Sequence, residues 1–187
     1  IFCPTTKASS ATASRVVLLA ALWLGLASPA WAENLLTCRG ALTDQNWPIA
    51  HQECLWAAKN GEIFSQVAVA YMHYMGQGVP RNFGQASKWF RRAAEAGNAL
   101  AQNNLGYMYS NGQGLLQNYV LAHMWYNLAA AQGEKTAGKN RLHLERRMPP
   151  AQIAQAQILA EDPSAQSSAE SQQYVFHKGW TARACRG

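Results

Sequence analysis

The side chains best suited to metal chemistry are a few histidines and cysteines, and their spacing completes no site. His51 and Cys54 lie three positions apart, which would place both on one face of a helix. A tetrahedral metal site needs about four ligands, and no second pair accompanies these two. The other histidines are scattered, without H-E-x-x-H or a similar spacing, at His73, His123, His143 and His177. We therefore predict no metal and no cofactor.

The four cysteines, Cys3, Cys38, Cys54 and Cys185, form no C-x-x-C pair. In an oxidising compartment, Cys38 and Cys54 could close a loop and stabilise the fold by about 3 kcal/mol. The alternative is two unpaired thiols, because removal of an N-terminal segment containing Cys3 leaves an odd number. Catalysis by a serine nucleophile is not expected, since neither Ser-x-x-Lys nor Gly-x-Ser-x-Gly occurs. We predict that the protein is not an enzyme.

The charge balance is basic, with 16 Lys and Arg against 10 Asp and Glu and a net charge of +6. Such an excess fits an acidic partner or an anionic envelope surface, but it is too diffuse to identify one. The basic residues would form two helical faces, for which solvated helix surface is the commoner explanation. These faces comprise Lys88, Arg91 and Arg92, and then Lys135, Lys139, Arg141, Arg146 and Arg147.

The first 32 residues have the layout of a secretory signal after an upstream extension. Arg15 precedes an apolar run over 16–26, and Pro29 is followed by Ala30-Trp31-Ala32, with small residues where a signal peptidase cleaves. The run is about half of the roughly 20 apolar residues that a membrane span needs, and a lipid anchor at Cys38 is a weaker alternative. We predict cleavage after Ala32, a periplasmic or secreted protein without a membrane span, and no nucleic-acid partner.

A repeat of 36 residues organises the middle of the chain. Residues 62–97 and 98–133 align without a gap, and unrelated segments would share only two or three identities. Helical spacing precedes Gly-Gln-Gly in each unit and resumes after an Asn, so each unit is predicted to be a helical hairpin. The identical pairs are Gln66/Gln102, Tyr71/Tyr107, Met72/Met108, Gly76/Gly112, Gln77/Gln113, Gly78/Gly114, Asn82/Asn118, Ala86/Ala122, Trp89/Trp125, Ala93/Ala129, Ala94/Ala130 and Gly97/Gly133.

Several of these identities have a structural role in a hairpin. A glycine can end the first helix in a left-handed conformation, and Asn82 and Asn118 can cap the second. Trp89 and Trp125 would fill the space beside small alanines that let helices approach closely. The predicted structural positions are Gly76, Gly78, Trp89, Gly97, Gly112, Gly114, Trp125 and Gly133.

Partial units flank the two repeats. A helix is expected from about Trp47, another over 134–147, and a last one whose apolar stripe is Ala151, Ala154 and Ile158. The predicted organisation is an N-terminal linker over 33–46, a helical solenoid over 47–162 and a disordered tail over 163–187. The fold class is therefore all-α.

The stretches 105–114 (LGYMYSNGQG) and 122–130 (AHMWYNLAA) resemble the Sel-1-like repeat, a relative of the tetratricopeptide repeat. The resemblance implies a right-handed α-solenoid and a role as adaptor or scaffold, often in the bacterial envelope, with no catalytic residues. The first repeat departs from the family pattern at Ala70, where the family usually has Gly, and at His73. Some cysteine-rich members are thought to hydrolyse cell-wall peptides or β-lactams. That activity is the alternative function, although the repeats here lack paired cysteines.

Variable positions on the first helix of each repeat are expected to line an inner groove. A surface that mixes tyrosine, amide and apolar groups suits a protein or peptide partner. For Tyr71 and Tyr107, the alternative is packing between repeats alone. The predicted function is binding of such a partner, with regulation of an envelope assembly or a signalling receptor as its setting. The groove candidates are Val67, Tyr71, Tyr74, Asn103, Tyr107 and Ser110.

Overall fold

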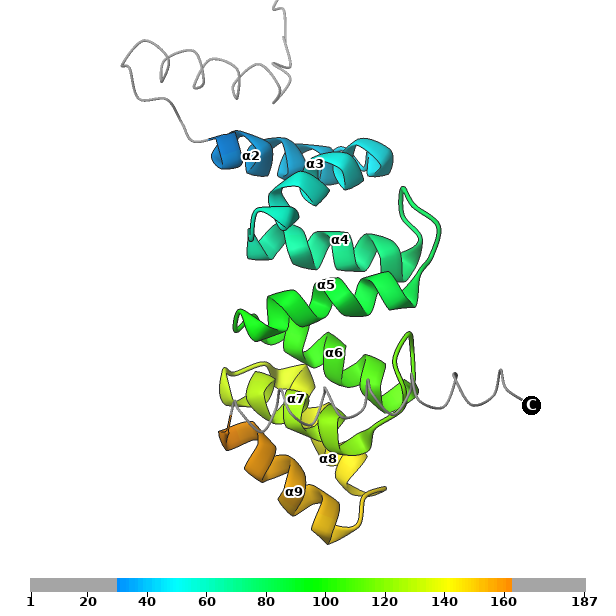
Figure 1. Cartoon of the computed structure of the whole chain (residues 1–187), viewed down its shortest axis with the longest axis vertical. Helices are drawn as coiled ribbons and strands as arrows, with labels where there is room; N and C mark the ends of the chain where they lie inside the picture. The colour runs from blue at the N-terminus through cyan, green and yellow to red at the C-terminus, as the bar shows by residue number, and fades with distance from the viewer. Residues whose placement is uncertain (1–29, 163–187) are drawn as a thin grey trace, which may run out of the picture.

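A computed structural model describes residues 30–162, with side chains from Thr37 onward. Most of the predicted signal segment and the whole predicted tail, 163–187, lie outside the described residues. Within 30–162 every regular element is a helix, and the helices stack in chain order along one long axis (Figure 1). The all-α solenoid is confirmed. The helices are α2 (Ala30–Thr43), α3 (Trp47–Lys59), α4 (Ile63–Met75), α5 (Phe83–Glu95), α6 (Ala99–Asn111), α7 (Tyr119–Ala131), α8 (Lys135–Glu145) and α9 (Pro150–Glu161).

The two repeats are the hairpins α4/α5 and α6/α7. Their helices begin and end at the residues that the sequence pattern predicts. Gly76 and Gly112 end the first helices with φ of 78° and 67°. An L-residue reaches that left-handed region only at a cost. The side chains of Asn82 and Asn118 accept hydrogen bonds from backbone N–H groups in the first turns of α5 and α7. Residues within each hairpin therefore determine where its two helices end and begin.

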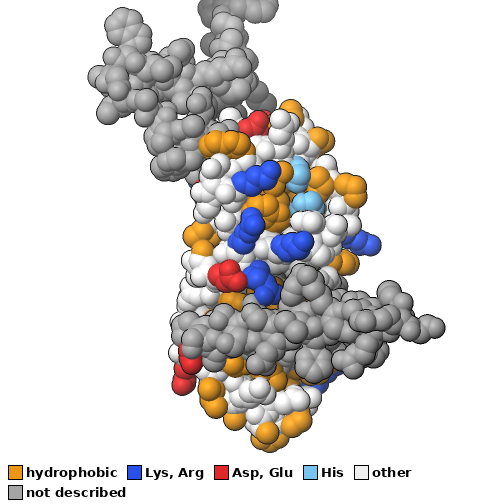
Figure 2. Space-filling view, viewed as in Figure 1, with side chains coloured by type: hydrophobic (Ala, Val, Ile, Leu, Met, Phe, Trp, Pro, Cys, Tyr) orange, Lys and Arg blue, Asp and Glu red, His pale blue; other side chains and the backbone are white. Residues whose placement is uncertain are grey.

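Basic side chains lie on the outside of the stack, and Figure 2 shows several of them over its middle. Lys88 and Arg92 on α5 are exposed. Arg91 is half-buried, and its guanidinium donates a hydrogen bond of 2.6 Å to the Tyr109 hydroxyl of the next helix. One member of this predicted basic face therefore joins neighbouring repeats rather than facing a partner.

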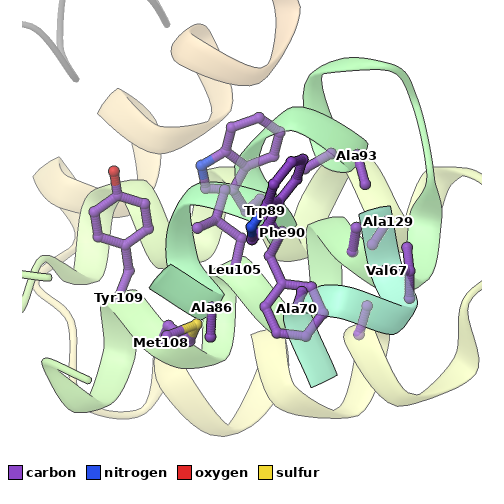
Figure 3. Close-up of a cluster of buried hydrophobic side chains, with 14 of the residues drawn as sticks. Val67, Ala70, Ala86, Trp89, Phe90, Ala93, Leu105, Met108, Tyr109 and Ala129 are labelled. Carbon is purple, nitrogen blue, oxygen red and sulfur yellow. The ribbon is translucent and has the colours of Figure 1, made fainter. Parts of the chain in front are cut away.

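Small and large side chains alternate in the core between the hairpins (Figure 3). Ala86 and Ala93 are fully buried, as are Leu105 and Met108, while Trp89 keeps only 8% of its surface. Because alanine carries one carbon beyond the backbone, α5 can approach α4 and α6 closely, and the indole fills the remaining space.

The second glycine of each Gly-Gln-Gly loop permits a contact between successive hairpins. A Cβ on Gly78 would lie 2.4 Å from the Trp47 carbonyl oxygen, and one on Gly114 would lie 2.3 Å from the Phe83 carbonyl carbon. Each loop therefore rests directly on the backbone that starts the second helix of the preceding hairpin. Only glycine fits at these two positions.

The linker predicted over 33–46 is mostly helical. α2 covers it up to Thr43 and pairs with α3, so the stack begins with a hairpin of its own. Cys38 and Cys54 are joined by a disulfide and are fully buried. Of the two alternatives that the sequence left open, the structure has the bond. α2 has too weak an apolar periodicity to be recognised alone, and this cross-link and its packing against α3 hold it.

The apolar stripe predicted for α9 is wrong. Ile158 is 65% exposed, and Ala151 and Ala154 are also exposed, whereas Ala156 and Leu159 are buried. Both sets of residues have helical spacing, so periodicity alone could not choose between them. The choice is made by α7, against which α9 packs in place of pairing along α8.

A buried glutamine bridges each repeat to the helix before it. Gln66 Nε2 donates to the Ala58 carbonyl at 3.2 Å, and Gln102 Nε2 donates to the Ala94 carbonyl at 3.1 Å. The oxygen of Gln102 also accepts a hydrogen bond of 2.8 Å from Gln132 Nε2. The oxygen of Gln66 is buried without a partner. The same motif is thus complete in the second repeat and incomplete in the first.

Replacing Gly114 by alanine should destabilise the fold far more than the same change at Gly133. Both glycines have positive φ, 68° and 87°. An alanine in this left-handed conformation costs about 1–2 kcal/mol of folding free energy in either variant. Only at Gly114 does the new Cβ meet backbone, since nothing lies within 4 Å at Gly133. Urea denaturation of Gly114→Ala should show a loss beyond about 4 kcal/mol. Equal losses in the two variants would contradict the proposed contact between hairpins.

Ala96→Gln should stabilise the protein by about 1 kcal/mol. Ala96 precedes Gln132 by one repeat length, so a glutamine there can donate to the unpaired oxygen of Gln66. The matched control is Ala96→Glu, whose carboxylate has similar size but cannot donate. Thermal denaturation should show a higher midpoint for the glutamine variant only. A similar gain from both variants would mean that added side-chain contact, and not the hydrogen bond, is responsible.

Candidate functional site

A groove of about 650 Å³ runs along α4. Its walls come from four different helices, and we call it the α4 groove. α4 provides the floor, α2 and the start of α3 form one side, and the start of α6 forms the other. Its lining includes Leu42, Trp47, Phe64, Val67, Tyr71 and Leu100.

Exposed apolar side chains stand at the rim of the α4 groove. Phe64 is 41% exposed and Leu100 is 43% exposed. The two residues are 36 positions apart, in the first turns of α4 and α6, so they occupy the same place in successive repeats. Large apolar groups exposed beside a groove are a common feature of interaction sites.

Tyr71 connects the groove to the core. Its ring meets Phe90 edge-on, with centroids 5.1 Å apart. Its hydroxyl accepts a hydrogen bond of 2.8 Å from Asn104 Nδ2 on α6. Burial raises the pKa of Tyr71, while the bond from Asn104 opposes that rise. Tyr71 therefore packs between repeats and lines the groove at once, so the two alternatives for this residue are not exclusive.

Of the six predicted groove residues, the structure brings Val67 and Tyr71 together in the α4 groove. Tyr74 lies further along, with its hydroxyl donating to Gln113 Oε1 at 3.0 Å. Asn103 is only 8% exposed, and Tyr107 is 42% exposed away from the groove. Ser110 donates to the backbone carbonyl of Tyr107 at 2.9 Å. That any of the six binds a partner remains a prediction.

Sequence reasoning missed nine of the eleven residues that line the groove, including the two at its rim and two of its wall. Phe64 and Leu100 could have been found, because their matching places in the two repeats are both large and apolar. Leu42 and Trp47 could not, because they precede the repeats and their segment was assigned to a linker or to the first edge of the solenoid.

Amide side chains continue the same surface beyond the groove. Asn104 reaches Tyr71 as described, and Asn140 Nδ2 on α8 donates to Asn103 Oδ1 at 3.0 Å. An amide group both donates and accepts, and the side chains of Asn104 and Asn140 are partly exposed, whereas Asn103 is covered. The surface of the first helices thus changes from apolar along α4 to amide-rich on α6 and α8.

The residues considered for metal chemistry are arranged differently from the sequence prediction. Cys54 is in the disulfide, so it is not a thiolate partner for His51. His123 is 1% exposed, and its Nε2 lies 2.9 Å from Glu145 Oε1. Within 37–162 no group of three or more His, Cys, Asp or Glu side chains comes together.

None of the helices between Ala30 and Glu161 is long and apolar enough to cross a bilayer.

A stack of helical hairpins with a groove on the side of the first helices defines an α-solenoid repeat protein. Residues 63–98 and 99–134 each match the Sel1 repeat model, and these ranges coincide with the hairpins α4/α5 and α6/α7. The chain contains two Sel1 repeats, as its sequence motifs predict. No protein with curated information matches it significantly.

Two similar solved structures carry the same kind of repeat. One is a protective antigen of uropathogenic Escherichia coli strains with an SLR fold, 29% identical over 66% of this chain, with a TM-score of 0.60. The other is a Sel1 repeat protein from Oxalobacter formigenes, 35% identical over 50% of this chain, with a TM-score of 0.49. This chain spans only 28% and 39% of their lengths.

Opening the Cys38–Cys54 disulfide should loosen one wall of the α4 groove. α2 provides Leu42 to that wall, and the bond ties α2 to α3. The double variant Cys38→Ala/Cys54→Ala should lose about 3 kcal/mol of stability. Hydrogen exchange should speed up in α2 and leave α6 and α7 unchanged. Unchanged exchange in α2 would show that packing alone holds the wall.

Proposed function

We propose that the protein is an exported adaptor that binds an extended peptide segment of a partner protein in the α4 groove. The observation that carries this proposal is the groove itself, with its apolar floor and with Phe64 and Leu100 exposed at its rim. A partner side chain placed there would bury apolar surface on both molecules. The family is typically one of protein-interaction scaffolds, which supports this reading.

The amide strip supports an extended ligand. Beyond the groove, the carboxamides of Asn104 and Asn140 are partly exposed on consecutive first helices, and the buried Asn103 holds Asn140 in place. A peptide anchored by one apolar side chain in the groove could run across these helices and exchange backbone hydrogen bonds with them. The apolar group would provide most of the affinity, and the amides would fix the direction and register of the chain.

Export is supported by two independent features. The segment from Arg15 to Ala32, which overlaps the start of α2, has the basic, apolar and small-residue order of a secretory signal. The Cys38–Cys54 disulfide is of the kind that persists in oxidising compartments. One similar solved protein is a protective antigen, which fits a location where other molecules meet the protein outside the cytoplasm. The setting that we propose is an envelope assembly or a membrane receptor that the adaptor regulates.

A lysine at the rim of the groove should abolish peptide binding. Peptides selected from a random displayed library on the mature chain would provide the probe, and fluorescence anisotropy would measure their affinity. Leu100→Lys and Phe64→Lys should each weaken binding at least about tenfold, equivalent to 1.4 kcal/mol, because they put a charge beside the apolar floor.

The matched control is Ile158→Lys, which places the same charge at an even more exposed apolar residue on α9, outside the groove. This variant should bind the selected peptides as the parent does. Circular dichroism would check that all three variants stay folded. Equal affinity across the parent and the three variants would rule out the α4 groove as the binding site.

A further inference from the structure

Two histidines face each other where α3 meets α4. His51 lies in the first half of α3, and His73 lies in the last turn of α4. Their ring centroids are 5.2 Å apart, with the ring planes at 88°. Both side chains are half-buried, and Figure 2 shows histidine side chains reaching the surface beside basic ones. The pair is formed by two helices, so no spacing along the sequence could reveal it.

Each ring has a nitrogen without a partner. His51 Nε2 and His73 Nδ1 are shielded from solvent, and neither makes a hydrogen bond within the described residues. A buried polar atom left unpaired costs free energy, and such an atom calls for an explanation such as a bound ion or water. Two of them belong here to neighbouring rings, whose centroids are 5.2 Å apart.

At the next two interfaces, other residues occupy the positions that correspond to His51 and His73. One repeat later, Tyr109 replaces His73, and its hydroxyl accepts a hydrogen bond from Arg91. Two repeats later, His123 replaces His51, and Glu145 pairs with its Nε2. At the first interface, no side chain of the described residues forms a hydrogen bond with His51 Nε2 or His73 Nδ1.

The rings are held in the form that binds metals. Burial lowers the pKa of both histidines, and the charge of His73 lowers that of His51 further. At neutral pH both imidazoles are therefore uncharged, and each has a nitrogen lone pair. Since Cys54 is held in the disulfide, the ligands on offer are nitrogens alone.

The separation of the rings fits a shared ion. A metal–imidazole bond of about 2.0–2.1 Å puts the centroids of two imidazoles on one tetrahedral ion roughly 5 Å apart. We propose that His51 and His73 form a two-histidine site for a borderline divalent transition metal of the Zn(II), Ni(II) and Cu(II) class. Water or a side chain of a partner completes the coordination, and the bound ion links the hairpin α2/α3 to α4.

The test uses the tag-free, oxidised protein with its free thiols alkylated, and ZnCl₂ as the probe. Zinc at about 100 times its dissociation constant should raise the thermal midpoint by several degrees, and MgCl₂ should not. His51→Ser and His73→Tyr place at each position the residue that the next repeat already has, Ser87 and Tyr109, so both variants should fold. Each should weaken zinc binding at least tenfold, while His143→Ala, at an exposed histidine on α8, should not.

Electron paramagnetic resonance of the Cu(II)-loaded protein gives a second readout. The parent should show coupling to two imidazole nitrogens, and each variant to at most one. No thermal shift with zinc, or a shift that both variants retain, would overturn the proposal. Loss of binding in only one variant would assign a single histidine and would likewise overturn the paired site. These readouts do not depend on peptide binding, so the proposed adaptor function can fail separately.

Discussion

The solenoid depends on one steric constraint, the contact of each Gly-Gln-Gly loop with the start of the second helix of the preceding hairpin. At Gly78 and Gly114 the loop approaches the backbone at Trp47 and Phe83 so closely that a single methyl group cannot fit. This contact fixes where one hairpin sits on the next, in addition to the close packing of the buried side chains. Once the register is set, equivalent residues of successive repeats meet equivalent neighbours. The paired roles of Gln66 and Gln102, or of Phe64 and Leu100, follow from it.

The repeats share one backbone arrangement but differ in their side chains. The proposed functions depend on these side-chain differences. His51 and His73 face each other at the first interface. At the second interface Tyr109 is the equivalent of His73, and at the third the His123–Glu145 pair occupies both equivalent positions. On α7, Leu121 and Met124 are buried, and α9 packs against this helix. The same positions of the uncovered helix α5 are Gln85 and Lys88, both exposed. A shared backbone therefore lets each interface have its own chemistry at little cost to the fold.

Local features of the repeats could be read from the sequence, because each depends on a few neighbouring residues. Gly76, Gly112, Asn82 and Asn118 act within a single turn, and their roles follow from backbone preference and capping. Features that depend on contact with a second helix could not be predicted from the sequence. The disulfide was left open, since spacing does not show that Cys38 and Cys54 have Cα atoms 4.8 Å apart. Asn103 has the spacing of a surface residue but is covered, with Asn140 of α8 bonded to it. The buried side of α9 is set by α7, which no periodicity within α9 can indicate.

The position of the α4 groove likewise depends on how separate helices meet. The loops of the two repeats span 76–82 and 112–118, whereas α2 and α3 are joined by 44–46 alone, with Gln45 at a φ of 55°. This first connection has no Gly-Gln-Gly loop, so the regular contact between hairpins begins only at Trp47. Leu42 and Trp47 are left beside α4 as one wall of an open groove. The sequence could place Val67 and Tyr71 on the floor, because they belong to the repeat. The wall comes from a hairpin that departs from the repeat, and that departure leaves the groove open beside α4.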